Sequence, residues 1–193
     1  GEGFLRDNPE IDAIVLGEYE NTFLEIVKRL NDNKSLHGIE NIIYRMNDGK
    51  IHVNPRSNKL IDLDRLPWPE RDTLPMYAYY DQFANSMPSP NVQIHASRGC
   101  PYGCIYCVWP QVLYGGQKYR TRNPVDVVDE IEWLIKKYGF KAFYFDDDTF
   151  NIGKERILNI CDELKKRGLH KIPWTAMCRA DTSDHETFLA MKE

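Results

Sequence analysis

The stretch VQIHASRGCPYGCIYC, residues 92–107, joins a short apolar strand pattern to three closely spaced cysteines. Cys100, Cys104 and Cys107 follow the spacing C-x3-C-x2-C, and thiolates at these intervals on a compact loop can converge on one soft metal centre. A closed zinc site takes four ligands and the common iron–sulfur clusters take four cysteines, whereas this loop supplies three. Three thiolates on a cluster would leave one iron open to an exogenous ligand, as a catalytic metal requires.

The sequence after the cysteine loop alternates strand patterns with amphipathic helix patterns. Strands are expected over Val92–Ser97, Lys141–Asp146 and Trp174–Arg179, and helices over Val125–Tyr138, Lys154–Arg167 and Asp184–Glu193. This alternation predicts right-handed βαβ units and a parallel sheet, hence an α/β fold. We expect a partial parallel (βα) barrel, because a closed barrel needs more strands than these. The cysteine loop would then lie at the carboxyl ends of the strands, where such folds build active sites.

The sequence before the cysteine loop has two parts that differ in residue pattern and composition. Ile11–Leu16 reads as a buried strand, Glu20–Leu30 as a helix with one apolar stripe of Phe23, Ile26, Val27 and Leu30, and residues 41–54 as a β-hairpin around Asn47-Asp48-Gly49. Residues 60–91 are rich in proline and aromatic side chains, so we expect an ordered connector wrapped on a domain surface. Its apolar load consists of Trp68, Met76, Tyr77, Tyr79, Tyr80 and Phe83.

Composition narrows the class of protein. The chain has 193 residues with 42% hydrophobic and 28% charged side chains, which is typical of an ordinary globular protein. A formal net charge of −4 argues against a general nucleic-acid binder, and no apolar stretch is long enough for a membrane helix. Five cysteines, three of them crowded together, fit a reduced, metal-binding chain better than a secreted disulfide scaffold.

The chain resembles the radical S-adenosylmethionine (SAM) superfamily, because the triple-cysteine signature, with Tyr106 before its last cysteine, follows the first strand of a parallel βα array. Residues 122–131, 143–150 and 174–181 are similar to the cobalamin-associated branch of that superfamily. Asp12–Glu20 is similar to the last strand and turn of the B12-binding domain that precedes the barrel in that branch. The cobalamin-ligating D-x-H-x-x-G motif does not occur in this sequence, and we expect the chain to be a truncated portion of two incomplete domains.

The resemblance implies a division of the chain into three parts. Residues 1–59 would be the C-terminal tail of a Rossmann-like B12-binding domain with a β-hairpin, residues 60–91 the connector, and residues 92–193 the N-terminal half of a radical SAM barrel. We expect the protein to act in the cytoplasm on an unidentified small-molecule substrate, with an electron donor such as flavodoxin or ferredoxin. No nucleic-acid partner and no membrane span are indicated.

The resemblance also implies the cofactors and their contacts. Cys100, Cys104 and Cys107 would hold a [4Fe–4S] cluster whose open iron is chelated by SAM, with Tyr106 beside the cofactor. Reductive cleavage of SAM would give methionine and a 5′-deoxyadenosyl radical, used for B12-dependent methyl transfer or for another reaction of the superfamily, such as an oxidation or a cyclisation.

Two further positions are implied to contact SAM. Asp146, Asp147 and Asp148 end the second strand, where the superfamily usually has a Gly-Gly-Glu-like motif for the SAM ammonium group. An acid suits that contact, but Gly-Gly is missing, so the particular aspartate is open. Arg179 would pair with the SAM carboxylate or ribose.

Simpler interpretations stay open for each of these residues. The cysteines would form a structural zinc site with His95 or Cys178 as the fourth ligand, and the chain would then be a non-catalytic binding module. The three aspartates would form a solvated turn or a cation site, and Arg179 a surface salt bridge. Cys161 lies on an apolar helix stripe and is expected in the core. Cys178 and Arg179 alternate along the expected third strand and would face opposite sides of the sheet.

Overall fold

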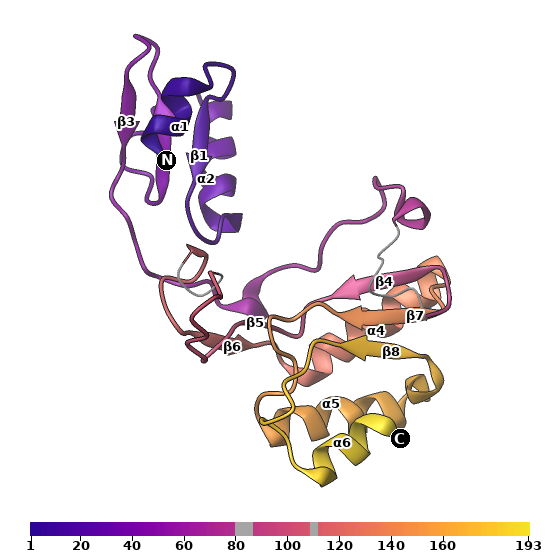
Figure 1. The fold of residues 1–193 in the computed structure, drawn as a ribbon. Helices are drawn as coiled ribbons and strands as arrows, with labels where there is room; N and C mark the ends of the chain where they lie inside the picture. The colour runs from indigo at the N-terminus through magenta and orange to yellow at the C-terminus, as the bar shows by residue number, and fades with distance from the viewer. Residues whose placement is uncertain (80–86, 109–111) are drawn as a thin grey trace. The chain divides into compact units, whose positions relative to one another are not determined.

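The computed structural model describes residues 1–79, 87–108 and 112–193, and it divides the chain into two compact units (Figure 1). The first unit comprises residues 1–61 and 101–118, and the second comprises residues 62–100 and 119–193. Tyr80, Phe83 and Trp109 lie outside the described residues. Within the described part of the chain, no helix is long and apolar enough to span a membrane.

The first unit is a small antiparallel sheet with two helices. Its elements are α1 (Glu2–Asp7), β1 (Ala13–Val15), α2 (Glu20–Asn31), β2 (Ile42–Arg45) and β3 (Ile51–Val53). The predicted hairpin is confirmed, because β2 and β3 pair antiparallel with Arg45 opposite Ile51. Its turn needs Gly49, whose φ of 82° lies in the left-handed region. β1 also pairs antiparallel with β2, and in the described residues it has no parallel partner.

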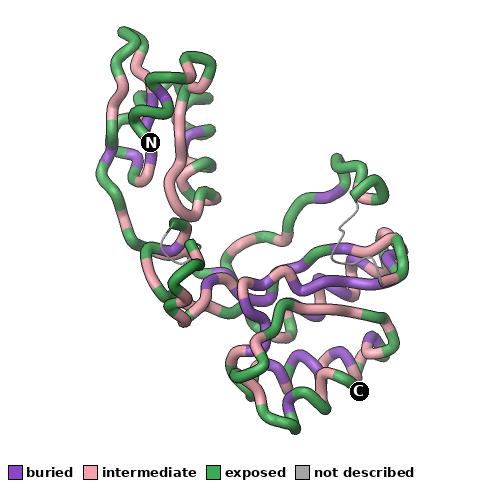
Figure 2. The backbone as a smooth tube through the Cα atoms, viewed as in Figure 1, coloured by how far each residue is buried: buried purple, intermediate pink, exposed green. Residues whose placement is uncertain are grey.

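Helix α2 buries only part of its apolar stripe. Ile26 is 7% exposed and packs with Ile42 and Tyr44 of β2. Phe23, Val27 and Leu30 are exposed, at 57%, 46% and 58% (Figure 2). The predicted helix is confirmed, and of its apolar stripe only Ile26 is buried. A three-stranded sheet covers one side of a helix only, so the remaining apolar residues face outward.

The second unit contains the predicted parallel sheet. Its strands are β4 (Asn91–Ile94), β7 (Ala142–Phe145) and β8 (Trp174–Ala176), and both neighbouring pairs in the order β4-β7-β8 are parallel. The helices α4 (Pro124–Tyr138), α5 (Lys154–Lys166) and α6 (His185–Lys192) follow the predicted spans and lie on one side of the sheet (Figure 1). The βαβ alternation and the parallel sheet are confirmed.

One hydrophobic core joins this sheet to its helices. Val92, Ile94, Phe143 and Phe145 project from alternate strand positions into it, at 4% exposure or less. The buried residues that α4 and α5 add are Val127, Val128, Ile131, Leu134, Ile157, Ile160, Cys161 and Leu164. The core therefore fixes the sheet so that the carboxyl ends of β4, β7 and β8 meet at one edge.

Two of the predicted strands have different bounds in the structure. The expected strand Val92–Ser97 divides into β4 and a separate β5 (Ser97–Gly99), which pairs antiparallel with β6 (Tyr119–Thr121). The N–H of Arg122 donates to the carbonyl of Ala96 at 2.9 Å, which extends this antiparallel pairing by one step beyond β5. β8 ends at Ala176, so the expected alternation of Cys178 and Arg179 along a strand is wrong.

The connector packs on the second unit through its aromatic and charged side chains. It contains two 3-10 turns, η1 (Leu63–Arg65) and η2 (Met76–Ala78), and a third, η4 (Leu169–Lys171), follows α5. The Trp68 ring nitrogen donates to Asp126 at 3.0 Å, and the Tyr77 hydroxyl donates to the carbonyl of Tyr138 at 2.7 Å. These bonds hold the described connector residues against α4.

Candidate metal and cofactor site

Several of the predicted site residues follow the carboxyl ends of strands in the second unit. Cys100 directly follows β5, Asp146–148 directly follow β7, and Arg179 lies three residues after β8. The ladder continues for one step past β7, where the N–H of Asp146 donates to the carbonyl of Ile94 at 2.9 Å. Parallel strands thus bring the aspartates and the cysteine segment to the same edge, as the alternating pattern predicts.

The three clustered cysteines form no disulfide, and they are assigned to different units. Cys100 belongs to the second unit, while Cys104 and Cys107 belong to the first. The N–H of Cys107 donates to the carbonyl of Cys104 at 3.0 Å, which closes a turn around Ile105 and Tyr106, and Tyr106 is 85% exposed. Among the described residues, no three Cys, His, Asp or Glu side chains form a ready-made metal site. Convergence of the three thiolates on one cluster stays a prediction.

The chemistry of the donors fits an iron–sulfur cluster. All three side chains are partly exposed and none is consumed in a disulfide, so their sulfurs are accessible to iron. Soft thiolate ligands are the donors that such clusters use. Cys161 offers a contrast, because it is 4% exposed in the core and burial raises the pKa of its thiol to about 11. The prediction that Cys161 is a core residue is confirmed.

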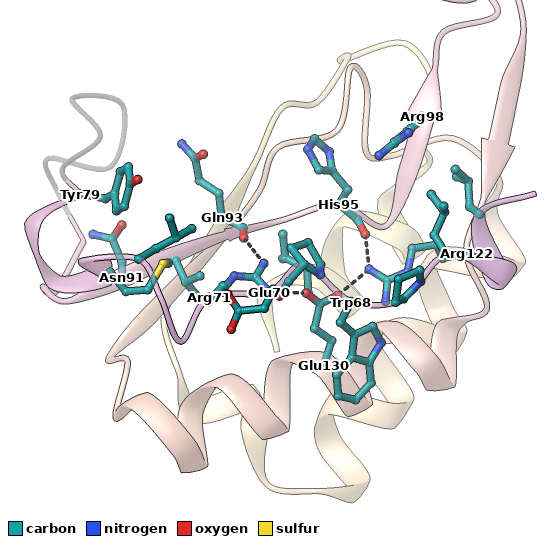
Figure 3. Close-up of a pocket in the computed structure, with 18 residues that line it drawn as sticks. Trp68, Glu70, Arg71, Tyr79, Asn91, Gln93, His95, Arg98, Arg122 and Glu130 are labelled. Carbon is teal, nitrogen blue, oxygen red and sulfur yellow. Dashed lines mark hydrogen bonds and ion pairs between the residues drawn. The ribbon is translucent and has the colours of Figure 1, made fainter. Parts of the chain in front are cut away.

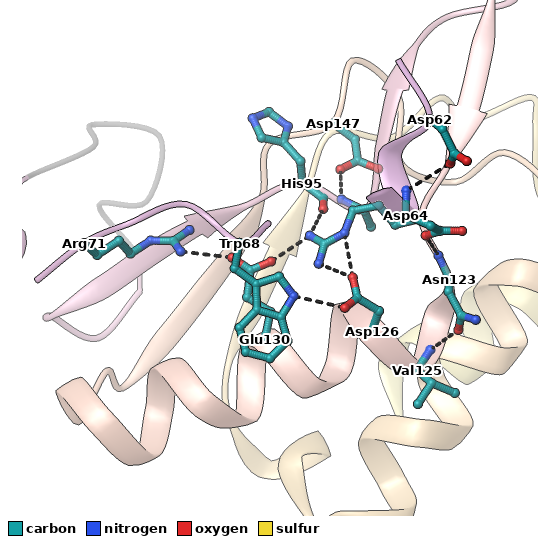
Figure 4. A network of polar contacts seen from close by, with 12 residues as sticks. Asp62, Asp64, Trp68, Arg71, His95, Asn123, Val125, Asp126, Glu130 and Asp147 are labelled. Carbon is teal, nitrogen blue, oxygen red and sulfur yellow. Dashed lines mark hydrogen bonds and ion pairs between the residues drawn. The ribbon is translucent and has the colours of Figure 1, made fainter. Parts of the chain in front are cut away.

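Asp147 is fully engaged within the protein. Its carboxylate accepts from the N–H of Ala96 at 2.8 Å (Figure 4) and from the hydroxyl of Ser97, and it pairs with Arg156 at 3.1 Å. Burial raises the pKa of Asp147, although the Ser97 hydrogen bond and the Arg156 charge oppose that rise. Its described contacts tie the end of β7 to the segment before the cysteines. A contact between Asp147 and SAM stays a prediction.

Asp148 and Thr149 contact the same segment at Gly99 and Cys100, which lie two and three residues after Ser97. The N–H of Gly99 donates to the Asp148 carboxylate at 2.8 Å. The Thr149 hydroxyl lies 3.7 Å from the Cys100 sulfur and also donates to the carbonyl of Asp148 at 2.7 Å. The Gly99 φ of 90° lies in the left-handed region, so a glycine is required where β5 turns into the cysteine loop.

Arg179 is held at its backbone by Asn151 and at its side chain by Asp181. Asn151 is 1% exposed, and its amide bonds to both the N–H and the carbonyl of Arg179, at 2.9 and 2.7 Å. The guanidinium forms an ion pair with Asp181 at 2.6 Å. This ion pair agrees with the simpler interpretation of Arg179. Its contact with SAM stays a prediction.

Sequence reasoning missed the polar residues that connect the end of β7 to the segment before the cysteines. Ser97, Thr149 and Arg156 carry no motif. Thr149 is about 50 residues from Cys100, and Arg156 pairs with Asp147, which is about 50 residues from its partner Ser97. A weak signal existed in Thr149, which directly follows the aspartates at the end of a strand. Their contacts arise from the parallel pairing of β4 with β7, which a single sequence predicts as a class but not residue by residue.

A buried network of ion pairs lies along the outer edge of β4. Glu130 of α4 is 1% exposed and pairs with both Arg71 and Arg122, at 3.0 and 2.6 Å (Figure 4). Arg71 donates to the carbonyl of Gln93 at 3.4 Å, and Arg122 donates to that of His95 at 2.7 Å. Burial disfavours the charged form of Arg122, but the neighbouring carboxylates outweigh burial and raise its pKa. The guanidinium groups thus occupy backbone acceptors that would otherwise pair with another strand.

A pocket of about 650 Å³ lies in the second unit between the connector and β4 (Figure 3). Trp68, Met76 and Tyr79 line it from the connector, and Gln93 and His95 line it from the strand. Of the described residues around it, none is a predicted cluster or SAM ligand. The exposed His95 belongs to this pocket, and its predicted alternative function as a zinc ligand stays untested.

Comparisons with known proteins give several relatives of most of this chain. The chain is 37% identical to an uncharacterized methyltransferase of Pyrococcus horikoshii, over 98% of this chain and 39% of that protein. It is 31% identical to the cytidylyl-2-hydroxyethylphosphonate methyltransferase of Streptomyces wedmorensis, over 91% of this chain and 37% of that protein. The chain thus spans less than two fifths of the length of either relative. No family model matches it.

A solved structure shares the fold. The radical SAM methyltransferase TsrM of Kitasatospora setae, with tryptophan and a SAM analogue bound, superposes with a TM-score of 0.73 at 21% identity, over 97% of this chain and 36% of that one. Another structure of TsrM contains cobalamin and a [4Fe–4S] cluster. At this identity the likeness establishes the α/β fold and not the chemistry.

Proposed function

Because the chain belongs, as a homologous portion, to the cobalamin-associated branch of the radical SAM superfamily, we propose that it carries the cluster-binding part of a radical SAM enzyme. Cys100, Cys104 and Cys107 would hold a [4Fe–4S] cluster through three thiolates. When bound, this cluster would supply one electron to SAM, whose carbon–sulfur bond breaks to give methionine and a 5′-deoxyadenosyl radical. The observation that carries the proposal is the partly exposed cysteine triad, which forms no disulfide, in a chain whose relatives include methyltransferases.

The remaining site residues would bind and orient SAM. Asp146 and Asp148 are partly exposed at the carboxyl end of β7, and an ionised carboxylate there would accept hydrogen bonds from the SAM ammonium group. Arg179 would exchange its ion pair with exposed Asp181 for the SAM carboxylate, which costs little because a surface pair contributes little. Tyr106, on the exposed turn between Cys104 and Cys107, would cover the cofactor.

The reaction of the whole protein is proposed as methyl transfer with cobalamin. The named relatives are methyltransferases, and TsrM contains cobalamin in one of its structures. The D-x-H-x-x-G motif does not occur in this sequence, so we assign no cobalamin ligand to it. We propose that residues 1–59 form the end of a B12-binding domain, residues 60–91 a connector, and residues 92–193 half of a barrel. A small-molecule substrate, a flavodoxin or ferredoxin as electron donor, and a cytoplasmic location complete the proposal.

Cysteine substitutions test the cluster ligands. Cys100→Ala, Cys104→Ala and Cys107→Ala, each reconstituted anaerobically with iron and sulfide, are expected to lose most of the iron that the unchanged chain binds. Cys161→Ala is the matched control, because its buried thiol is outside the triad and the variant should keep its iron. Iron and acid-labile sulfide are measured per chain. Equal iron in all four variants would show that the triad is not the ligand set.

A further inference from the structure

Three consecutive side chains after β7 contact the segment that leads to the first cysteine. Asp147 accepts from Ala96 and Ser97, Asp148 accepts from Gly99, and Thr149 lies against the sulfur of Cys100. The contacts run in order along both segments, all within the second unit. This order means that Cys100 is positioned by side chains as well as by its own backbone.

The side chains that make and hold these contacts are mostly buried. The side chains of Asp147 and Arg156 are 0% and 9% exposed, and Thr149 is 5% exposed. Arg156 also donates to the carbonyl of Phe150 at 2.7 Å, which fixes the residue after Thr149. Buried and hydrogen-bonded on both sides, Thr149 has little freedom to move away from Cys100.

The state of Cys100 decides which atom donates in its contact with Thr149. In the free thiol, the sulfhydryl can donate to the Thr149 oxygen while the hydroxyl proton goes to the Asp148 carbonyl. A thiolate bound to iron has no proton to donate, so the Thr149 hydroxyl is then the one donor in this pair, and its single proton turns from the Asp148 carbonyl to the sulfur. Hydrogen bonds to cluster sulfurs tune the reduction potential, and outer partners of this kind also strengthen metal binding.

We propose that Asp148 and Thr149 are positioning residues for Cys100, with the Thr149 hydroxyl donating a hydrogen bond to the Cys100 thiolate when that thiolate binds iron. This proposal rests on the cluster of the proposed function. It differs from a SAM contact, because the two residues would then act on the cluster before SAM is present.

The first test uses the whole chain without metal. Asp148→Ala removes the acceptor of the Gly99 N–H, so amide hydrogen exchange in residues 96–100 is expected to rise about tenfold, as for a local opening cheaper by about 1.4 kcal/mol. Asp162→Ala is the matched control, because it removes the same charge from an exposed position on α5. Unchanged exchange in a folded Asp148→Ala chain would overturn the positioning by Asp148.

The second test uses the reconstituted chain in the absence of SAM. Thr149→Val keeps the shape and removes the hydroxyl, and it should lose iron to a chelator about tenfold faster, with a more negative cluster potential in an EPR-monitored titration. Thr149→Ser keeps the hydroxyl and should restore both values. A purely structural function of Thr149 would not move the potential, and equal values in Val and Ser variants would overturn the proposed bond.

The two tests separate this inference from the proposed function. If the unchanged chain takes up iron but neither variant alters exchange, iron loss or potential, the inference fails and the cluster stands. If the unchanged chain takes up no iron, the proposed function fails in this chain, and the Thr149 bond to a thiolate fails with it. The exchange experiment then still decides whether Asp148 positions the segment.

Discussion

Glu130 is a buried carboxylate that forms ion pairs with two arginines of the second unit. Its carboxylate pairs with Arg71 from the connector and with Arg122 from the segment before α4, and Arg122 also pairs with Asp126. Removing one partner of a buried pair leaves the other charge without compensation in a poorly solvated place, which costs more than the pair contributes. The stability of the connector's packing should therefore depend on this one carboxylate.

Glu130→Gln is expected to lower the free energy of unfolding of the second unit by about 3 kcal/mol, because buried Arg71 loses its ion pair and Arg122 keeps only its pair with Asp126. Urea unfolding followed by tryptophan fluorescence measures the change, since Trp68 and Trp133 lie next to each other with ring centroids 5.7 Å apart. Glu132→Gln is the control two residues along α4. Its carboxylate is partly exposed and pairs with Lys136, so little change is expected. Equal effects of the two substitutions would contradict the network.

Asp147 illustrates how much of a single residue's function can be predicted from the sequence. An aspartate at the end of a parallel strand predicts a polar function at that edge, and the structure does place it there. Whether it faces a ligand or the protein depends on Ala96, Ser97 and Arg156, whose contacts with it span up to 51 residues. Spacing along a chain does not encode such distances, and the burial of Asp147 could not be predicted.

At the scale of elements, the first unit buries only part of the apolar stripe of α2. Ile26 faces the sheet, and neighbouring Val27 faces outward. Ile26→Ala should lower the free energy of unfolding of this unit by about 2–4 kcal/mol, because it leaves a cavity against β2. Val27→Ala should change it by less than about 0.5 kcal/mol.

Amide hydrogen exchange of β2, residues 42–45, is the measurement, because the second unit contains most of the tryptophans and fluorescence reports little on the first. Faster exchange in Ile26→Ala alone is the expected result. Comparable acceleration in both variants would mean that the outward face of α2 also stabilises the unit in solution.

Element types were predictable and their ends were less so. Helices α4 and α5 have strong periodicity and left-handed glycines at 139 and 168, and their predicted spans hold within a residue. The strand expected from residue 92 divides where Ala96 accepts a hydrogen bond from the N–H of Arg122. Beyond the end of β8, the N–H of Arg179 donates to the side chain of Asn151 and not to a neighbouring strand. Both are tertiary contacts that do not alter local hydrophobic patterning.

At the scale of the whole molecule, the α/β class and the family follow from the cysteine spacing and the βα rhythm, and relatives at 37% and 31% identity support the family. The division into two units cuts the cysteine loop between Cys100 and Pro101. No periodicity predicts that residues 101–118 group with the first unit, as the bond from Lys118 to the carbonyl of Asn58 illustrates. The assembly of Cys100, Cys104 and Cys107 around iron is the prediction on which the proposed function depends.

EPR of the anaerobically reconstituted and reduced chain, recorded with and without SAM, tests that prediction most directly. We expect about four irons per chain and an EPR signal that SAM perturbs, because three thiolates leave one iron open to a ligand. One tightly bound zinc with no iron uptake, or a cluster signal indifferent to SAM, would contradict it.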